Sequence, residues 1–557
     1  MLKRPPNALT LLFPMTLAMS CGDGPAQPIV GTAEVEVTHY DYHFDMETRE
    51  ARTTLALTTT TPGNCFALAM RTEGLRATSI DGEAPISEAH NGSQASFCGI
   101  GWPAMSEILL TTTTTVPLAT WENSQVGYSV STDIEGNPFS YMVSWIDGCD
   151  RFGPCDNTPS AFARYTLTVN HPADHQILCA GKLTPGPTQS VCEFDFDGGP
   201  TYSSFGFAAS PSWNRIDMGD WGGIAVSFYD MPSANLAAQV SVDEHKDFTA
   251  WMVEEFGPYP YGDEMRFAVG PTFWNGFEHP GNILLNDRLS TGSLGSAYSN
   301  PLAHTISHEI AHQWAGDQTT LSGTYDFVWK EAMAEYLVFV HKEERVSQAR
   351  ATRTLRAWKS FSRNSEFYLV PNERPPLIEY YGDVYGPGPM ILFRQLEAIF
   401  DRASILTALK TLLGQERAIG VADVKKALEN ATSSNLDSYF ESWVYGQGVP
   451  RWPQYRVSTQ PVTKGVKVDV EQLEANKDLF GCAFTISLRG DNDQAMDLRV
   501  NLGVDGKALW TTTVAPGFEV VDFRFDTGNE CLGTLAGAPV AETSGKKTNP
   551  MVAPAFH

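Results

Sequence analysis

Two histidines four residues apart constrain this chain more than any other feature of its sequence. They are His308 and His312, in the segment His-Glu-Ile-Ala-His. On a helix, residues four apart lie on the same face with Cβ atoms about 5 to 6 Å apart, so both imidazoles can reach a single metal ion. Glu309 then lies beside that ion. The spacing therefore predicts a helix that carries two zinc ligands and a general base for hydrolysis.

Glu331 completes the predicted metal site from a second helix, which we expect to begin near residues 324–326. With three protein ligands, a tetrahedral zinc ion keeps one position open for water, as a catalytic site requires. A buried pair of structural histidines is the alternative interpretation. The amphipathic pattern around residues 308–312, and the glutamate that follows it, favour the metal site.

The length and charge of the chain limit its class and its partners. With 557 residues the chain is too long for one hydrophobic core, and three domains are expected. Its formal net charge of -26 and its pI near 4.8 argue against nucleic acid and anionic membrane surfaces as partners, because both bind basic faces. The sequence leaves the oligomeric state open.

The first residues have the pattern of a secretory signal peptide. Lys3 and Arg4 precede an apolar run over residues 8–19, which is too short to span a membrane as a helix of the mature protein. Residues 17–21 also resemble a bacterial lipoprotein cleavage box, in which Cys21 becomes the lipidated first residue. The protein is therefore expected to be exported, either to the bacterial cell envelope, where lipidated Cys21 would attach it to a membrane, or into the medium.

The cysteine count supports export independently. Of nine cysteines, Cys21 belongs to the predicted signal, and the other eight are an even number, as disulfides in an oxidising compartment require. The sequence leaves their connectivity open, and reduced cysteines packed in a core are an alternative. Clustering along the chain favours neighbours as partners: Cys65 with Cys98, Cys149 with Cys155, Cys179 with Cys192, and Cys482 with Cys531.

The residue pattern divides the chain into segments of different structure. Residues 1–28 read as signal peptide and linker, and short runs of β-branched or alternating residues predict an all-β domain over residues 29–232. Helical periodicity dominates residues 233–450, which include the metal motif. The predicted helices cover residues 235–256, 300–316, 326–344, 348–361, 389–401, 403–413, 421–430 and 436–446.

Strand patterns return after a break at residues 450–453, where two prolines flank Arg451 and Trp452. Residues 451–536 predict a small β-sandwich, and residues 537–557 predict a flexible tail. The chain is thus expected to be a multidomain α+β protein.

This order of domains and the metal motif resemble the aminopeptidase N family of zinc metallopeptidases, in the gluzincin clan. The family signature has two histidines and a glutamate with eighteen residues between the second histidine and the glutamate, as His308, His312 and Glu331 have. Residues 312–317, His-Gln-Trp-Ala-Gly-Asp, are similar to the family's His-Gln-Trp-Phe-Gly-Asn. The resemblance covers roughly residues 35–525. It implies a thermolysin-like, mostly helical catalytic domain in a short three-domain member that lacks the C-terminal helical domain.

Two further site residues are implied by this resemblance. Residues 275–279, Asn-Gly-Phe-Glu-His, align with the family's Gly-x-Met-Glu-Asn strand, so Glu278 would bind the α-ammonium of the substrate. Residues 384–388 look like the family's Tyr-x-Lys-Gly segment, so Tyr385 would be the catalytic tyrosine that stabilises the oxyanion.

Four positions near the site depart from the family pattern. Lys330 stands where the family has Asn, Ala332 where it has Gly, Phe277 where it has Met, and His279 where it has Asn. These changes leave the zinc ligands and the base intact and bear on substrate preference. Lys330 would also change the charge of the site if its side chain points inward.

The leading hypothesis is an exported aminopeptidase that holds one zinc ion per chain and hydrolyses the N-terminal peptide bond of peptides. Glu309 would take a proton from zinc-activated water. An endopeptidase with the same zinc chemistry is one alternative, which a comparison of free and acetylated substrates separates. A surface lipoprotein that binds zinc or peptides without catalysis is another, and the intact Glu309 argues against it.

Overall fold

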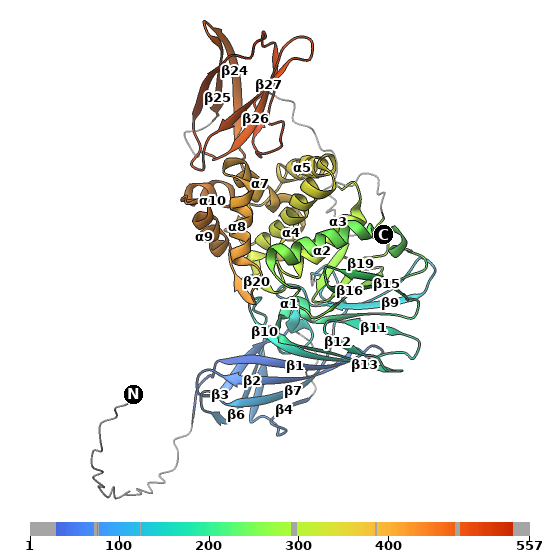
Figure 1. The fold of residues 1–557 in the computed structure, drawn as a ribbon. Coiled ribbons are helices and arrows are strands. Elements are labelled where there is room, and N and C mark those ends of the chain that lie inside the picture. Colours follow the sequence, from blue (N-terminus) through green and yellow to red (C-terminus); the bar gives the residue numbers. More distant parts are fainter. Residues whose placement is uncertain are drawn as a thin grey trace, which may run out of the picture.

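The computed structural model of the chain describes residues 29–71, 75, 77–122, 124–290, 298–384, 387–473 and 479–537. The predicted signal segment, residues 1–28, and the part of the predicted tail from residue 538 onward lie outside this range. Figure 1 shows three successive parts: a β-rich N-terminal part, a middle part of helices and one sheet, and a C-terminal β part. The predicted multidomain α+β class is confirmed.

The largest sheet of the N-terminal part has seven strands in the order β12-β13-β10-β1-β2-β7-β4. Neighbouring strands are antiparallel except β1 and β10, which run parallel. The threonine-rich strand β7 has Thr112 and Thr114 buried, in line with the high strand propensity of threonine. The strands are β1 (Val35–Asp45), β2 (Glu50–Thr59), β4 (Ala77–Ile80), β7 (Glu107–Thr115), β10 (Phe162–Asn170), β12 (Lys182–Thr184) and β13 (Gln189–Pro200).

Two smaller sheets complete this part, in the orders β3-β6-β5 and β11-β14-β9-β8. All three disulfides here join the cysteines that their clustering predicted: Cys65 to Cys98, Cys149 to Cys155, and Cys179 to Cys192. The strands are β3 (Gly63–Ala69), β5 (Ser87–His90), β6 (Gln94–Trp102), β8 (Gly127–Thr132), β9 (Pro138–Val143), β11 (Gln176–Cys179) and β14 (Gly206–Ser210).

A five-stranded sheet in the order β15-β16-β17-β19-β18 runs across the predicted domain boundary at residue 232. Strands β16, β17 and β19 are parallel, and β18 pairs antiparallel with β19 at one edge. This edge strand carries Glu278. The strands are β15 (Asn214–Trp221), β16 (Ile224–Asp230), β17 (Glu264–Gly270), β18 (Gly276–His279) and β19 (Asn282–Asn286).

Helices pack on and beyond this sheet, close to the predicted positions. The first of them starts later than predicted, at Val242 instead of residue 235. The preceding residues form a single 3-10 turn (Ala237–Gln239), and Val240 is extended. Helix α6 is absent from the prediction because a proline pair before it and glycines after it obscure its short pattern. The helices include α2 (Val242–Phe256), α3 (Pro301–His312), α4 (Phe327–His341), α5 (Gln348–Ser362), α6 (Leu377–Val384), α7 (Pro387–Ile399), α8 (Arg402–Leu412), α9 (Val421–Thr432) and α10 (Asp437–Trp443).

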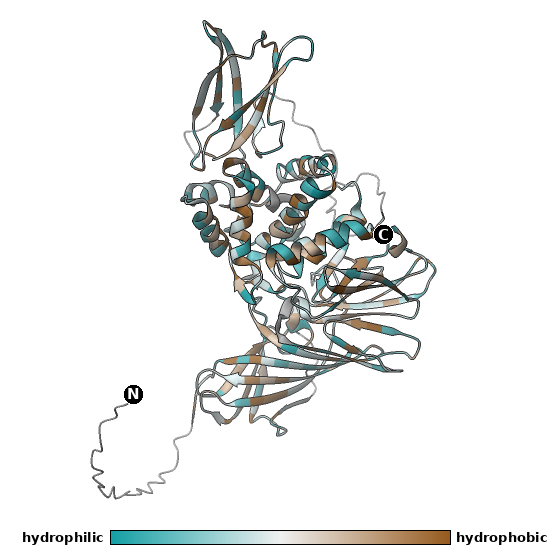
Figure 2. Ribbon diagram, viewed as in Figure 1, coloured by the Kyte–Doolittle hydropathy of each residue, from teal (hydrophilic) through white to brown (hydrophobic). Residues whose placement is uncertain are grey.

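Helix α3, which carries the histidine motif, is buried on every side. All of its residues are buried, because α2, α4 and strand β18 cover it. The amphipathic pattern expected around the motif is therefore not what places this helix. By contrast, Figure 2 shows hydrophilic residues along the partly exposed helix α5 and a mixture of both kinds along α2. In the described part of the chain, we find no helix with the length and apolarity that a membrane crossing requires.

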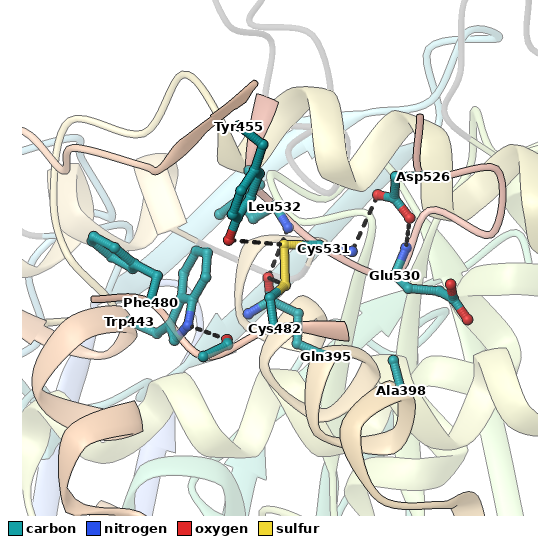
Figure 3. The surroundings of a disulfide bond; sticks show 12 residues. Gln395, Ala398, Trp443, Tyr455, Phe480, Cys482, Asp526, Glu530, Cys531 and Leu532 are labelled. Carbon is teal, nitrogen blue, oxygen red and sulfur yellow. Dashed lines mark hydrogen bonds between the residues drawn. A yellow bond between two sulfur atoms is a disulfide. The ribbon is translucent and has the colours of Figure 1, made fainter. Parts of the chain in front are cut away.

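The C-terminal part is the predicted β-sandwich, with sheets in the orders β28-β25-β24-β30 and β27-β26-β29. Its disulfide, Cys482 to Cys531, lies against α7, where Gln395 Oε1 accepts a hydrogen bond of 2.7 Å from the amide of Leu532 (Figure 3). A buried ion pair between Lys359 and Asp526 ties the same sandwich to α5. The strands are β24 (Gln454–Val462), β25 (Gly465–Gln472), β26 (Ala483–Arg489), β27 (Ala495–Asn501), β28 (Leu509–Val514), β29 (Asp522–Arg524) and β30 (Thr534–Leu535).

Candidate metal centre and catalytic cavity

The start of helix α3 is fixed by local sequence. Asn300 is its N-cap, and its side-chain oxygen accepts a hydrogen bond of 3.0 Å from the amide of Ala303. Pro301 occupies the first turn, where a missing amide hydrogen costs nothing. Helix α4 packs against α3, so residues from both helices face one point between them.

Three side chains converge at that point. His308 Nε2 lies 2.9 Å from His312 Nε2, and Glu331 Oε2 lies 3.2 Å from the first nitrogen and 3.5 Å from the second. All three side chains are at most 3% exposed. The three residues predicted as metal ligands are thus brought together from two separate helices.

The imidazole of His312 is oriented for metal binding. Its Nδ1 lies 3.0 Å from the carbonyl oxygen of Ala315, which can only accept, so Nδ1 carries the hydrogen. Burial lowers the pKa of His312, and the nearby ammonium of Lys330 lowers it further. The ring is therefore neutral, and its Nε2 directs a lone pair towards His308 and Glu331.

His308 is held by carboxylates on both sides. Its Nδ1 lies 3.2 Å from Glu335 Oε1, and its Nε2 faces Glu331. Burial lowers the pKa of His308, but these two carboxylates outweigh burial and raise it well above its usual value. A proton and a metal ion therefore compete for Nε2, and metal binding should release this proton.

This donor set fits a zinc ion. Two imidazole nitrogens and a carboxylate oxygen are standard zinc ligands at about 2.0 to 2.2 Å, which puts tetrahedral donor atoms about 3.4 Å apart. The three donor atoms here lie within 4.8 Å of one another. Glu331 Oε2 is buried, and among the described residues only the two imidazole nitrogens face it closely enough to interact. A cation between the three donors would satisfy this oxygen.

Glu335 and His304 form a second layer behind the donors. Glu335 Oε1 lies 3.1 Å from His304 Nε2 as well as close to His308. Burial raises the pKa of Glu335, but the two imidazoles outweigh burial and lower it to about 2. Glu335 is thus an anion that fixes the ring of His308, as outer carboxylates commonly do for ligand histidines.

Glu309 lies beside the donor cluster with its carboxylate against strand β18. A Cβ atom at Gly276 would sit 2.2 Å from Glu309 Oε1, so this glycine leaves the space that the carboxylate fills. Glu309 is only 2% exposed, and burial raises its pKa to about 8. Its carboxyl group can therefore both hold and release a proton near neutral pH.

Lys330 points inward and pairs with Glu278. Lys330 Nζ lies 2.5 Å from Glu278 Oε1 and 3.0 Å from Glu331 Oε1. Burial lowers the pKa of Lys330, but the two carboxylates outweigh burial and raise it, so the side chain is a cation. The residue predicted to bind a substrate's ammonium is therefore already in contact with an ammonium of the chain itself.

The other departures from the family pattern lie in different places. His279 does not line the cavity; its Nδ1 donates to the carbonyl oxygen of Ser203, which belongs to the short helix α1 (Thr201–Ser204). Burial lowers the pKa of His279 to about 4, so it is neutral. Phe277 lines the cavity beside Glu278, and Ala332 is buried in α4.

The cavity in front of the donors is narrow and has an aromatic wall. Trp145, Trp274 and Tyr381 line it together with the charged residues described above. The ring centroid of Tyr381 lies 5.2 Å from that of Trp145 and 5.5 Å from that of Trp274. The open volume is about 20 Å³, room for about one water molecule.

The aromatic wall of the cavity was not predicted from the sequence. Trp145 comes from the N-terminal part and has a φ of 40°, a strained value for a bulky residue. Tyr381 comes from α6, the unpredicted helix. Tyr385, the predicted catalytic tyrosine, lies outside the described residues.

The chain resembles known proteins in sequence and in fold. Residues 241–443 match the family model described as the peptidase family M1 domain. Aminopeptidase N of Streptomyces lividans is 23% identical over 321 residues, which are 52% of this chain and 36% of that protein. Human aminopeptidase N is 26% identical over 207 residues, 34% of this chain and 21% of that protein. The matched segments thus span about a third or less of the length of these relatives.

One solved structure matches most of the fold. It is the crystal structure of Legionella pneumophila aminopeptidase A in complex with aspartic acid, with a TM-score of 0.70 and 14% sequence identity. The match covers 91% of this chain and 60% of that chain. At this identity the likeness concerns the fold alone.

The second-layer carboxylate provides a test of the metal centre. Replacing Glu335 by Gln should weaken zinc affinity about 10- to 100-fold, because His308 loses the anion that orients its ring. Zinc affinity is measured by competition with a chromophoric chelator. Glu344→Gln, at a side chain that is 45% exposed, is the matched control and should bind zinc as the parent does. Equal affinity of the Glu335 variant and the parent would show that this layer does not support the metal.

Proposed function

We infer that this chain, an aminopeptidase N-like protein with a peptidase family M1 domain, works as an aminopeptidase, and we propose that one zinc ion carries its activity. Peptides would be its substrates, and the N-terminal peptide bond would be the bond hydrolysed. The observation that carries the proposal is the convergence of His308, His312 and Glu331 beside the buried carboxyl of Glu309.

The three converging side chains would hold the zinc ion. Bound there, zinc supplies a Lewis acid for the scissile carbonyl and brings the pKa of a water molecule towards 7. Glu335 and the carbonyl of Ala315 would keep the two imidazoles in the orientation that this requires.

Glu309 would act as the general base. It would take the proton of the attacking water and pass it to the leaving amine, which needs a group that holds a proton only temporarily. Its pKa of about 8, set by burial, would fall towards neutral once a divalent cation lies nearby. Gly276 leaves room for its carboxylate, because any side chain there would displace it.

Replacing Glu309 by Gln should preserve zinc binding and reduce turnover of an aminoacyl p-nitroanilide by about 10² to 10⁴-fold, because the amide cannot accept the proton. Zinc content by atomic emission and turnover are measured on the same sample. A chelator should abolish turnover of the parent protein, and added zinc should restore it. Near-parental turnover of the zinc-loaded variant would remove Glu309 from the mechanism.

The narrow cavity favours the end of a peptide over its interior. An internal segment must leave the site at both ends, whereas a terminal residue needs one opening. With an open volume of about 20 Å³, the described walls must move to admit a substrate residue, and an added acetyl group requires a larger movement. The endopeptidase alternative would be favoured if the parent cleaved free and N-acetylated peptides equally. Zinc binding without hydrolysis of any aminoacyl amide would favour the non-catalytic alternative.

The oxyanion donor is proposed to be Tyr385, on the resemblance of residues 384–388 to the family segment. Tyr385→Phe should reduce kcat about 10² to 10³-fold. Tyr381→Phe is the matched comparison, because Tyr381 lines the cavity and its burial, reinforced by nearby carboxylates, raises the pKa of its phenol. The kcat of the Tyr381→Phe variant should fall by less than about tenfold. A large loss in the Tyr381 variant alone would transfer the role to that residue, and unchanged kcat in both would leave the oxyanion without a tyrosine donor.

We also propose that the protein is exported and carries lipid on Cys21. The basic and apolar residues before Cys21 support this, as do the four disulfides, which suit an oxidising compartment. Expressed in a bacterial host, the mature chain should begin at Cys21 with the added mass of a lipid, and it should sediment with membranes. Cys21→Ser should release it into the soluble fraction. A mature N-terminus elsewhere, without lipid, would contradict the proposal.

A further inference from the structure

The subsite implied for the substrate's amine contains an ammonium from the chain itself. Lys330 Nζ lies 2.5 Å from Glu278 Oε1, and both side chains are at most 6% exposed. Lys330 also lies 3.0 Å from the second oxygen of the ligand Glu331. It is the one lysine or arginine among the described residues that line the cavity. A peptide's α-ammonium would have to approach Glu278 beside this cation.

The charges in the cavity also disfavour the binding of a substrate's ammonium. Glu278, Glu309 and Glu331 are its three carboxyl groups. Lys330 compensates one of them, and a divalent cation held by the histidines and Glu331 would compensate the other two. The cavity then has no net negative charge to offer an incoming ammonium, and two ammonium groups near one carboxylate would repel each other.

Moving Lys330 aside would be costly. Its side chain is 3% exposed, and it is held between carboxylates from two elements, β18 and α4. Separating a buried ion pair leaves charges without compensation in a medium of low polarity. A substrate ammonium could replace Lys330 at Glu278 only by meeting this cost.

We propose that Lys330 takes the place of the substrate's α-ammonium at Glu278, so that this enzyme selects its substrates without requiring a charged N-terminal amine. The inference rests on the proposed function and defines its substrate class. Acyl groups of the size and shape of an amino acid should be accepted with or without the amine. Groups larger than an amino acid should be excluded by the walls of the cavity.

The test compares two substrates that differ only in the amine: leucine p-nitroanilide and its des-amino analogue, 4-methylpentanoyl p-nitroanilide. For the parent protein the ratio of their kcat/KM values should be below about tenfold, since a hydrogen bond to a charged group is worth about 10- to 100-fold when it forms. Lys330→Met and Lys330→Gln free Glu278 and should raise the ratio about 10- to 100-fold. A parent ratio above about tenfold overturns the proposal, whatever the variants do.

A binding measurement separates this inference from the proposed function. Leucinol and 4-methylpentan-1-ol, which differ only in the amine and cannot be hydrolysed, are titrated calorimetrically into the zinc-loaded parent protein and the zinc-loaded Lys330→Met variant. The amine should improve binding to the variant by about tenfold or more and improve binding to the parent by less. This result supports the role of Lys330 even if neither substrate is hydrolysed, in which case the proposed function alone fails.

A second substitution shows whether Glu278 is the group that Lys330 occupies. In the Lys330→Met background, Glu278→Gln should abolish the gained preference for the amine, because the carboxylate that attracts it is gone. If the amine preference of Lys330→Met persists without the carboxylate, Glu278 is not the subsite and the proposal is wrong. Thermal unfolding of each variant identifies any that fail to fold, and the parent ratio decides the question without them.

Discussion

The burial of several carboxylates around one point is the constraint on which the rest of this structure depends. Glu278, Glu309, Glu331 and Glu335 are each at most 5% exposed. Buried anions are costly unless cations or hydrogen-bond donors compensate them. Here Lys330, His304 and His308 supply part of the compensation. A metal ion between His308, His312 and Glu331 would supply the remainder, which explains why so much negative charge can lie in a narrow cavity.

The surrounding fold serves to bring these groups together from distant parts of the sequence. Strand β18, at the edge of the middle sheet, presents Glu278 and the space at Gly276 to helix α3. Gln313, directly after α3, stabilises the contact of this helix with the turn after β18, because its side-chain oxygen accepts a hydrogen bond of 2.8 Å from the amide of Gly281. Asp317 accepts one of 2.6 Å from the hydroxyl of Ser203 and so joins the N-terminal part to the same helix. The residues after His312 thus act as supports of the site.

Much of this arrangement could be predicted from the sequence because it depends on local spacing. The four-residue spacing of His308 and His312 placed both on one helix face. Most helices and strands also lie where their residue patterns predicted them. The disulfide pairings also joined neighbouring cysteines along the chain, although the two cysteines are 33 and 49 residues apart in two of the pairs. The resemblance to the aminopeptidase N family is confirmed by the match of residues 241–443 and by the similar relatives.

What escaped prediction depends on contacts between distant segments. The sequence shows that Lys330 precedes the predicted metal ligand Glu331. Only the fold shows that the side chain of Lys330 points towards Glu278 on strand β18. Trp145 reaches the cavity from the N-terminal part in a strained conformation, which no local pattern signals. The burial of α3 on all sides likewise results from packing by α2, α4 and β18, which lie far from it in the sequence or follow after a long loop.

X-ray absorption spectroscopy of the zinc-loaded protein tests the central claim most directly. We expect a first shell of nitrogen and oxygen atoms at about 2.0 to 2.1 Å, with the outer-shell scattering of two imidazoles. Substitution of His308 or His312 should remove one imidazole from that pattern. Zinc bound without imidazole scattering, or with sulfur in its first shell, would contradict the account.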